Sequence, residues 1–282
     1  MEAVGWLTAN FVEQIQKAHS KKRPIAEHIA NLSNATLAGL IEYGCLRRSF
    51  PDLPGLPPAI TDSELGRELN RVASEIGLRS NGRSEPPSIS HEPRELEFVV
   101  VRDEPDLLSD PVQMMFMRVT QATKQAGFSV QTANEFQGAF AEMIANAIEH
   151  SNSPIPIVVG YHIRPNIASF VVADVGRGVY DSLRENPDHQ DVANHAEAIR
   201  RALQDGVSRY REPRGNGFRP IFRAMMNNWG VLRFRSGKGC LTMDGTGLTA
   251  NQGVQHYPPD LPGFQVAVSC RSTDITSEIP VV

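Results

Sequence analysis

The pattern of apolar and polar residues predicts helices in the first third of the chain. Hydrophobic residues recur at helical spacing over residues 4–19, 24–43 and 62–76. Pro24 suits a first helical turn, and Gly44 suits a helix end. For the third helix, Thr61 or Asp62 is the expected N-cap and Gly77 the expected C-cap.

The remaining two thirds of the chain mix predicted strands and helices. Apolar runs predict strands at residues 96–101, 155–163, 167–174, 231–235 and 264–270, with the second and third strands joined by an Arg-Pro-Asn turn. Amphipathic patterns predict helices at residues 111–126, 133–151, 191–205 and 218–228. This order favours an α+β two-layer sandwich, in which helices cover one face of a mixed β-sheet.

Two segments rich in proline divide the chain. Residues 49–58 contain four prolines and a glycine, and residues 79–93 are polar and rich in proline and serine. Such stretches do not continue a helix and usually form surface linkers. We therefore expect a helical N-terminal region of unknown role at residues 1–93 and a second domain at residues 94–282.

The predicted helix at residues 133–151 has two distinct faces. A helical projection gathers six apolar residues in one stripe: Phe136, Phe140, Met143, Ile144, Ala147 and Ile148. Glu142, Asn146 and His150 are spaced four apart and form a ridge on another face. Such a ridge is most often a solvated surface, so by itself it does not indicate a site.

Two glycine-containing segments follow this helix. The first is Asp174-Val175-Gly176-Arg177-Gly178, where a carboxylate ends a strand and the glycines allow close backbone approach or positive φ. The second is Gly215-Asn216-Gly217-Phe218, which precedes a predicted helix, and Arg214 adjoins it. A glycine loop before a helix binds anions well because free N–H groups and the helix dipole face the ligand.

Taken together, the three segments resemble the GHKL superfamily, which includes DNA gyrase, sensor histidine kinases and MutL. Glu142 and Asn146 match its ExxxN motif, and the two glycine segments match its DxGxG and GxG boxes. The segment EMIANAIEHS is most similar to the corresponding segment of anti-sigma-factor serine kinases and related stand-alone ATPases. The resemblance covers about residues 96–270 and leaves the N-terminal region unassigned.

The resemblance implies an ATP-binding Bergerat fold and assigns roles to these residues. Asn146 would coordinate Mg²⁺, Glu142 would activate the attacking water or hydroxyl, and Asp174 would accept a hydrogen bond from the adenine amino group. Gly176 and Gly178 would let the backbone approach the nucleotide. The phosphates would be held by the second box and its neighbour, namely Arg214, Gly215, Asn216, Gly217 and Phe218.

The sequence departs from this family in two places. A threonine usually follows a glycine near the last strand, but here the matching pair is either Gly263-Phe264 or the earlier Gly245-Thr246. The HExxxP phosphoacceptor motif of sensor histidine kinases is absent, which argues against an autophosphorylating sensor kinase.

Lys238 lies in an Arg-Phe-Arg-Ser-Gly-Lys-Gly stretch that we expect to form a hairpin turn.

Composition narrows the class of protein without identifying it. The formal net charge of −4 gives no reason to expect generic nucleic-acid binding. Cys45, Cys240 and Cys270 are scattered, which excludes a disulfide scaffold and a CxxC zinc site and fits a reducing cytoplasm. No apolar run is long enough for a membrane helix, and the N-terminus does not read as a secretory signal.

Three functions therefore stay open from the sequence. The first is an ATP-driven switch that phosphorylates or controls a regulatory protein, which the resemblance suggests has a STAS-like fold. The second is an ATPase that couples hydrolysis to conformational change or homodimer formation. The third is a nucleotide-binding interaction module without turnover, against which the presence of Glu142 argues, because binding alone does not need this carboxylate.

Overall fold

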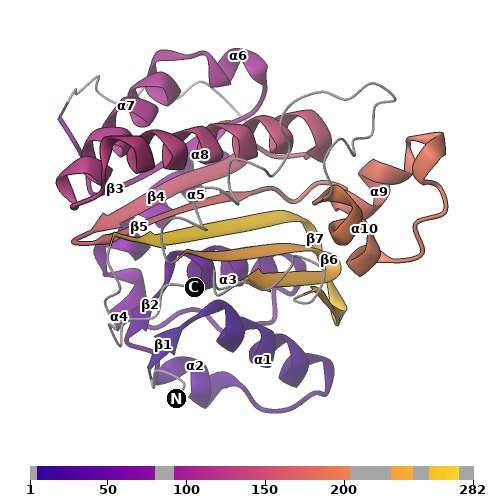
Figure 1. Ribbon diagram of the computed structural model, residues 1–282. Helices are drawn as coiled ribbons and strands as arrows, with labels where there is room; N and C mark the ends of the chain where they lie inside the picture. Colours follow the sequence, from indigo (N-terminus) through magenta and orange to yellow (C-terminus); the bar gives the residue numbers. More distant parts are fainter. Residues whose placement is uncertain (1–4, 80–91, 204–229, 244–253, 273–282) are drawn as a thin grey trace.

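A five-stranded antiparallel sheet forms the centre of the molecule (Figure 1). The computed structural model describes residues 5–79, 92–203, 230–243 and 254–272, with the backbone alone for 75–79 and 254–259. The strand order is β3-β4-β5-β7-β6. The strands are β3 (Leu96–Val101), β4 (Ile157–Arg164), β5 (Ile167–Ala173), β6 (Val231–Met243) and β7 (Val254–Arg271).

The expected mixed sheet is wrong, because every neighbouring pair of strands in this sheet is antiparallel. The β4–β5 hairpin turns at Pro165 and Asn166, as the sequence predicts, and Arg164 pairs with Ile167. Strands β5 and β6 run in the same direction, as expected for strands joined by helices. However, β7 lies between them and pairs with both, so no parallel pair forms.

Helices cover both faces of the sheet rather than one (Figure 1). On β5, Phe170 and Val172 belong to a core shared with α7 (Asp110–Gln125) and α8 (Val130–Ser151). Val171 and Ala173 face the opposite way, into a core shared with the N-terminal helices. The continuous burial of β5 fits a strand with both faces covered, whereas one solvent face would give alternation.

The N-terminal region is broken into shorter elements than its apolar pattern predicts. Its elements are β1 (Trp6–Leu7), α1 (Ala9–Ser20), α2 (Ala26–Ala30), β2 (Asn34–Ala35), α3 (Leu37–Ser49), α4 (Pro58–Thr61) and α5 (Glu64–Arg79). The expected helix over 24–43 is wrong because β2 pairs with β1 in its middle. Thr36 then starts α3, since its hydroxyl accepts a hydrogen bond from the Gly39 N–H. Gly44 lies inside α3 and does not end a helix.

Helix caps explain the other shifted boundaries. The first helix begins at Ala9 instead of residue 4, because Thr8 is its N-cap. The helix expected at 62–76 begins at Glu64, and the Ser63 hydroxyl rather than Thr61 or Asp62 accepts from the Gly66 N–H. Gly77 falls inside this helix, whose last residue is Arg79.

The elements around α7 and α8 follow the predictions more closely. The helix expected at 111–126 is α7, and the one expected at 133–151 is α8, which begins earlier because Ser129 caps it. The helix expected at 191–205 is shorter, α10 (His195–Ala202), preceded by α9 (Gly178–Arg184) and the 3-10 helix η1 (Pro187–His189). The helix expected at 218–228 lies outside the described residues. A short helix, α6 (Glu104–Leu107), precedes α7.

Lys238 lies within β6 and not in a hairpin turn. The strand continues to Met243, past an irregularity in its pairing with β7 around Gly237. Gly237 has φ +57°, which permits this local change of register without ending the strand.

A buried charge network joins the N-terminal helices to the sheet. Arg233 of β6 pairs with Glu42 of α3 at 2.8 Å and with Glu13 of α1 at 2.5 Å. Arg235 donates to Gln16 and lies 3.7 Å from Glu42. All five side chains are buried. The boundary near residue 93 stays a prediction, but the regions on its two sides share one hydrophobic core and this polar network.

Candidate functional site

Helix α8 presents its polar ridge at the edge of a buried stripe. Five of the six stripe residues predicted from the sequence are buried, and Ile148 is half-buried against the same core. Glu142 and Asn146 are half-buried beside this stripe. No hydrogen bond from either side chain is found among the residues that the structure describes. The two polar groups thus lie partly shielded, without hydrogen-bond partners in the described part of the chain.

Asp174 ends strand β5 as a buried carboxyl group. Its side chain is only 2% exposed, and its Oδ1 accepts a hydrogen bond from the Gly176 N–H at 2.7 Å. Its Oδ2 is buried and has no hydrogen-bond partner in the part of the chain that the structure describes. Burial raises the pKa of Asp174 to about 7, and the bond from Gly176 opposes that rise. The second oxygen is therefore a buried acceptor without a donor among the described residues.

Direct hydrogen bonds hold the loop after Asp174 against the C-terminal end of α8. The Arg177 N–H donates to the Ser151 carbonyl at 2.9 Å, and the Arg177 Nε donates to the His150 carbonyl at 2.8 Å. Asn152 ends α8 in the left-handed conformation, with φ 46°. The ExxxN helix and the DxGxG loop, which are separated by a hairpin in sequence, therefore meet at one end of the sheet.

Contacts within the protein already require glycine at Gly176 and Gly178. A Cβ on Gly176 would lie 2.0 Å from the Ser151 carbonyl oxygen. Gly178 has φ +74°, and a Cβ there would lie 2.6 Å from the Ser236 hydroxyl. These glycines permit the close packing of the loop, as the sequence allowed, and the role toward a nucleotide that the resemblance gives them stays a prediction.

The last strand places Gly263 and Phe264 beside Asp174. The Asp174 N–H donates to the Phe264 carbonyl at 2.9 Å. Gly263 has φ +85°, and a Cβ there would lie 2.1 Å from the Asp174 carbonyl oxygen. The Phe264 side chain packs against Phe234, with ring centroids 4.8 Å apart. Thus Phe264, rather than a threonine, follows the glycine at this position, while Thr246 lies outside the described residues.

Two polar residues that the sequence did not single out support the site. The Gln265 amide donates to the Asp174 carbonyl at 3.0 Å and to the Pro262 carbonyl at 2.9 Å. The Ser236 hydroxyl accepts from the Val179 N–H and donates to the Gly263 carbonyl, both at 2.9 Å. Their only sequence signal was a polar residue inside an apolar strand, which many strands contain.

The predicted phosphate-binding box is not among the described residues. This segment consists of five residues that all lie outside the described ranges: Arg214, Gly215, Asn216, Gly217 and Phe218. Of the arginines in the segment before this box, Arg201 forms ion pairs with Asp191 and Glu197, at 2.6 Å each. It therefore serves a local structural role in α10.

Side-chain acidities limit the chemistry of this end of the sheet. Burial, with a smaller effect of Glu149, raises the pKa of Glu142, which makes this carboxylate a better base than an exposed one. Burial also raises the pKa of Cys45 and Cys240 to about 12, so neither offers a thiolate near neutral pH. Carboxylate and amide oxygens, not sulfur, are the reactive groups here.

The oxygen atoms at this site would hold a cation such as Mg²⁺ only together with further oxygens from a bound ligand and water. Among the described residues, no group of three or more His, Cys, Asp or Glu side chains is arranged to hold a metal ion. The amide oxygen of Asn146 is the kind of ligand that Mg²⁺ accepts, but Mg²⁺ is usually held by one or two protein oxygens together with phosphates and water. Asn146 thus offers one oxygen of the kind that this cation accepts.

Comparison with known proteins adds no assignment. The chain matches no protein-family model, and no curated protein matches it significantly. None of the helices that the structure describes is long and apolar enough to cross a membrane.

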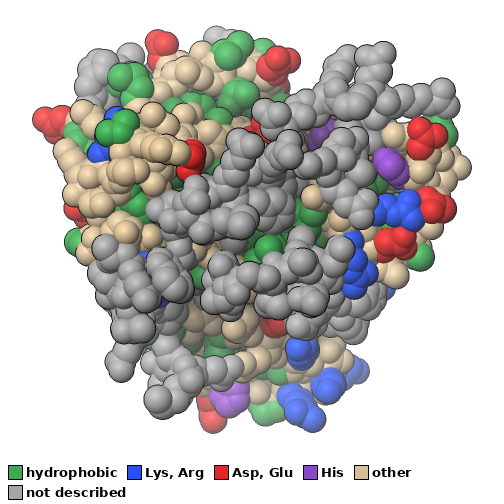
Figure 2. Space-filling model, in the orientation of Figure 1, with side chains coloured by type: hydrophobic (Ala, Val, Ile, Leu, Met, Phe, Trp, Pro, Cys, Tyr) green, Lys and Arg blue, Asp and Glu red, His purple; other side chains and the backbone are tan. Residues whose placement is uncertain are grey.

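The surface is mixed in charge, with basic side chains gathered at the lower end of the view in Figure 2, where α1 and α2 lie.

Proposed function

We propose that the protein binds Mg·ATP at the end of β5, as a member of the GHKL superfamily with a Bergerat fold. The main support is the buried Asp174 carboxyl group, which uses one oxygen for its own loop and leaves the other without a partner among the described residues. An unsatisfied buried acceptor costs about 1–3 kcal/mol, so a ligand that donates to it gains this energy. The adenine amino group is such a donor.

Helix α8 supplies the groups for the other end of the nucleotide. Asn146 offers an amide oxygen to the cation, and Glu142, one turn earlier, offers a carboxylate to the attacking water or hydroxyl. Bound Mg²⁺ would neutralise phosphate charge and orient the transferred group. The phosphates themselves are assigned to Arg214 and the Gly215–Phe218 box, as the resemblance implies.

We infer that the output is control of a partner protein, by phosphorylation or by a nucleotide-dependent contact. The raised pKa of Glu142 favours turnover over simple binding, because it brings the carboxylate closer to the acidity of an effective general base. The regulatory partner, its STAS-like fold and a cytoplasmic location are proposals that rest on the resemblance. Hydrolysis coupled to homodimer formation is the second candidate.

Titration calorimetry with ATP and Mg²⁺ tests the binding. The wild type should bind the nucleotide, and Asn146→Ala should remove the dependence of binding on Mg²⁺. Asn134→Ala is the matched control, because Asn134 is an exposed residue of the same helix. The absence of binding by the wild type at millimolar nucleotide would exclude the proposal.

Glu142→Gln separates binding from turnover. This variant should keep ATP affinity and lose turnover by about 10²–10⁴-fold, the usual contribution of a general base. Glu135→Gln, which lies on the same helix and is hydrogen-bonded to Gln131, should keep full turnover. Unchanged turnover in Glu142→Gln would show that this carboxylate is not the base.

Incubation with γ-labelled ATP and candidate partner proteins separates the kinase from the ATPase. Label on a partner protein would identify a kinase, and release of free phosphate without labelled protein would identify an ATPase. Binding without either product would leave an interaction module as the function.

A further inference from the structure

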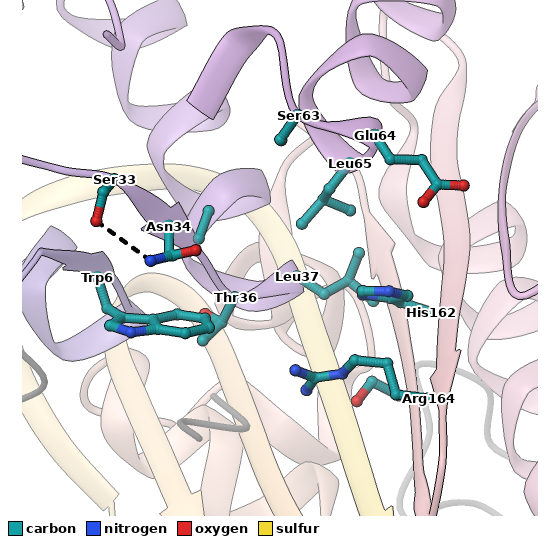
Figure 3. A pocket seen from close by; sticks show the side chains of 12 residues that line it. Trp6, Ser33, Asn34, Thr36, Leu37, Ser63, Glu64, Leu65, His162 and Arg164 are labelled. Carbon is teal, nitrogen blue, oxygen red and sulfur yellow. Dashed lines mark hydrogen bonds between the residues drawn. The ribbon is translucent and has the colours of Figure 1, made fainter. Parts of the chain in front are cut away.

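A cavity lies where the N-terminal region meets the β4–β5 hairpin, at the end of the hairpin opposite Asp174. It has a volume of about 220 Å³ and is lined from one side by Trp6, Thr36 and Leu37 and from the other by His162 and Arg164. Figure 3 shows the Arg164 guanidinium extending from β4 toward Trp6, beneath Leu37 and His162. The cavity therefore combines an aromatic wall, an aliphatic wall and a cation.

The cation in this cavity has no hydrogen-bond or ion-pair partner among the residues that the structure describes. Arg164 forms no hydrogen bond or ion pair with any residue in the described part of the chain, and its Nε is buried. Burial and the charge of Arg271 both lower the pKa of Arg164. Leaving a guanidinium partly desolvated, near a second cation and without a carboxylate, is unfavourable in the free protein.

The other polar groups around the cavity do not neutralise Arg164. Burial lowers the pKa of His162 to about 4, so this ring is uncharged at neutral pH and adds no positive charge. Glu64 is the acidic residue among those lining the cavity, but it is exposed and forms no ion pair with Arg164. Thr36 already accepts from the Gly39 N–H as the cap of α3.

We propose that this cavity binds a small organic anion, whose carboxylate or phosphate group pairs with Arg164 while its body lies against Trp6 and Leu37. Arginine suits this role because its planar fork donates two parallel hydrogen bonds to either group. The cavity is smaller than the roughly 300–1,000 Å³ that drug-sized ligands occupy, which limits the ligand to a compact molecule.

The anion site is separate from the proposed nucleotide site. Arg164 and Ile167 flank the turn at one end of the β4–β5 hairpin, whereas Asp174 follows the other end of β5. The cavity also lies on the sheet face that carries the N-terminal helices. The proposal thus stands whether or not the chain binds ATP, and binding here would give the N-terminal region a ligand of its own.

Tryptophan fluorescence tests the proposal directly. The chain has two tryptophans, so Trp229→Phe leaves Trp6 as the single reporter. Benzoate and phenyl phosphate should each change Trp6 emission in a saturable way, and neutral benzamide should not. Inorganic phosphate should bind more weakly than phenyl phosphate, because it lacks a body to contact Trp6 and Leu37.

Variants of Arg164 give the decisive comparison. Arg164→Met should weaken binding of benzoate and phenyl phosphate at least about tenfold, and Arg164→Lys less, because lysine keeps the charge but loses the planar fork. Arg164→Met should not lower the unfolding temperature, since it removes a cation that has no partner among the described residues. Arg102→Met, at an exposed position after β3, and Asp174→Asn should leave anion binding unchanged.

Three results would overturn the proposal. The first is no change in Trp6 emission with either anion at millimolar concentration. The second is equal binding by Arg164→Met and its parent, and the third is equal binding of benzamide and benzoate. If Arg164→Met does not fold, Arg164→Lys carries the comparison, and an unchanged affinity in that variant for both anions would also contradict the assignment.

Discussion

At the scale of single residues, burial changes what each side chain can do. Asp174 is an ordinary carboxylate in sequence, yet its position at the end of a covered strand raises its pKa to about 7 and leaves one oxygen without a donor in the described part of the chain. Arg164 is not distinguished from other arginines by the sequence, yet it lines a cavity and pairs with no acidic side chain among the described residues. A ligand with a hydrogen-bond donor would satisfy the Asp174 oxygen, and a ligand with an anionic group would pair with the Arg164 guanidinium.

The raised pKa of Asp174 predicts a stability that falls as pH rises. The folded state holds a proton on this group up to about pH 7, whereas the unfolded chain releases it near the ordinary value of 3.8. The folded state therefore binds more protons between these two values, and the free energy of unfolding decreases with pH across that window. At one pKa unit per 1.36 kcal/mol, the upper limit is on the order of 4 kcal/mol.

Urea unfolding at pH 5 and pH 8 measures this effect in the wild type and in Asp174→Asn. The amide keeps an oxygen acceptor for Gly176 and has no charge to bury, so the variant should lose the part of the pH dependence that Asp174 contributes. An identical pH dependence in the two proteins would show that Asp174 does not titrate in this range.

At the scale of elements, hydrophobic patterns predicted several helices and strands well and the two longest strands poorly, since β6 and β7 extend far beyond the expected 231–235 and 264–270. Helices α7 and α8 and strands β3 and β5 lie within a few residues of their expected bounds. The predictions failed where single hydrogen bonds decide the chain path, as at Thr36 and Ser63, whose hydroxyl groups start α3 and α5. Periodicity does not distinguish a continuous helix from two helices joined by a two-residue strand.

The Gly263 turn is expected to be the most sensitive backbone position at the candidate site. Gly263→Ala should destabilise the protein by at least about 2 kcal/mol, because alanine disfavours positive φ and its Cβ would meet the Asp174 carbonyl oxygen. The same displacement should weaken ATP binding. Chemical denaturation and calorimetry on the same samples measure the two effects.

Gly138→Ala is the matched control for this experiment. Gly138 lies exposed inside α8, and a Cβ there would meet nothing within 4 Å. Alanine should therefore stabilise the helix by about 0.5–1 kcal/mol. Equal effects of the two substitutions would contradict the strained geometry at Gly263.

At the scale of the whole molecule, the N-terminal region forms a third layer. It shares a hydrophobic core with the sheet, and two arginines of β6 reach the polar side chains of α1 and α3 through buried contacts. A complete buried ion pair adds little net stability, but removal of one partner leaves the other charge buried without compensation, which is strongly destabilising. The two regions are therefore expected to unfold together.

Arg233→Met should destabilise the whole molecule by about 3–5 kcal/mol, because it leaves Glu13 and Glu42 buried without their main partner. Urea unfolding followed by Trp6 fluorescence in the Trp229→Phe background, and in parallel by far-ultraviolet circular dichroism, should give one transition for both probes. Arg102→Met should leave that transition unchanged. Separate transitions for the two probes would instead support an independent N-terminal domain with its boundary near residue 93.

The sequence by itself determined the main helices and strands and the residues worth testing. Alternation and helical spacing follow from local geometry, so β5, α8 and the Glu142–Asn146 ridge were predictable. The tertiary structure decided the antiparallel strand order, the burial of the second sheet face and the meeting of Ser151 with Gly176. It also decided which polar atoms lack partners, because satisfaction of a buried group depends on residues far away in the chain, such as Gln265 beside Asp174 and Trp6 across the cavity from Arg164.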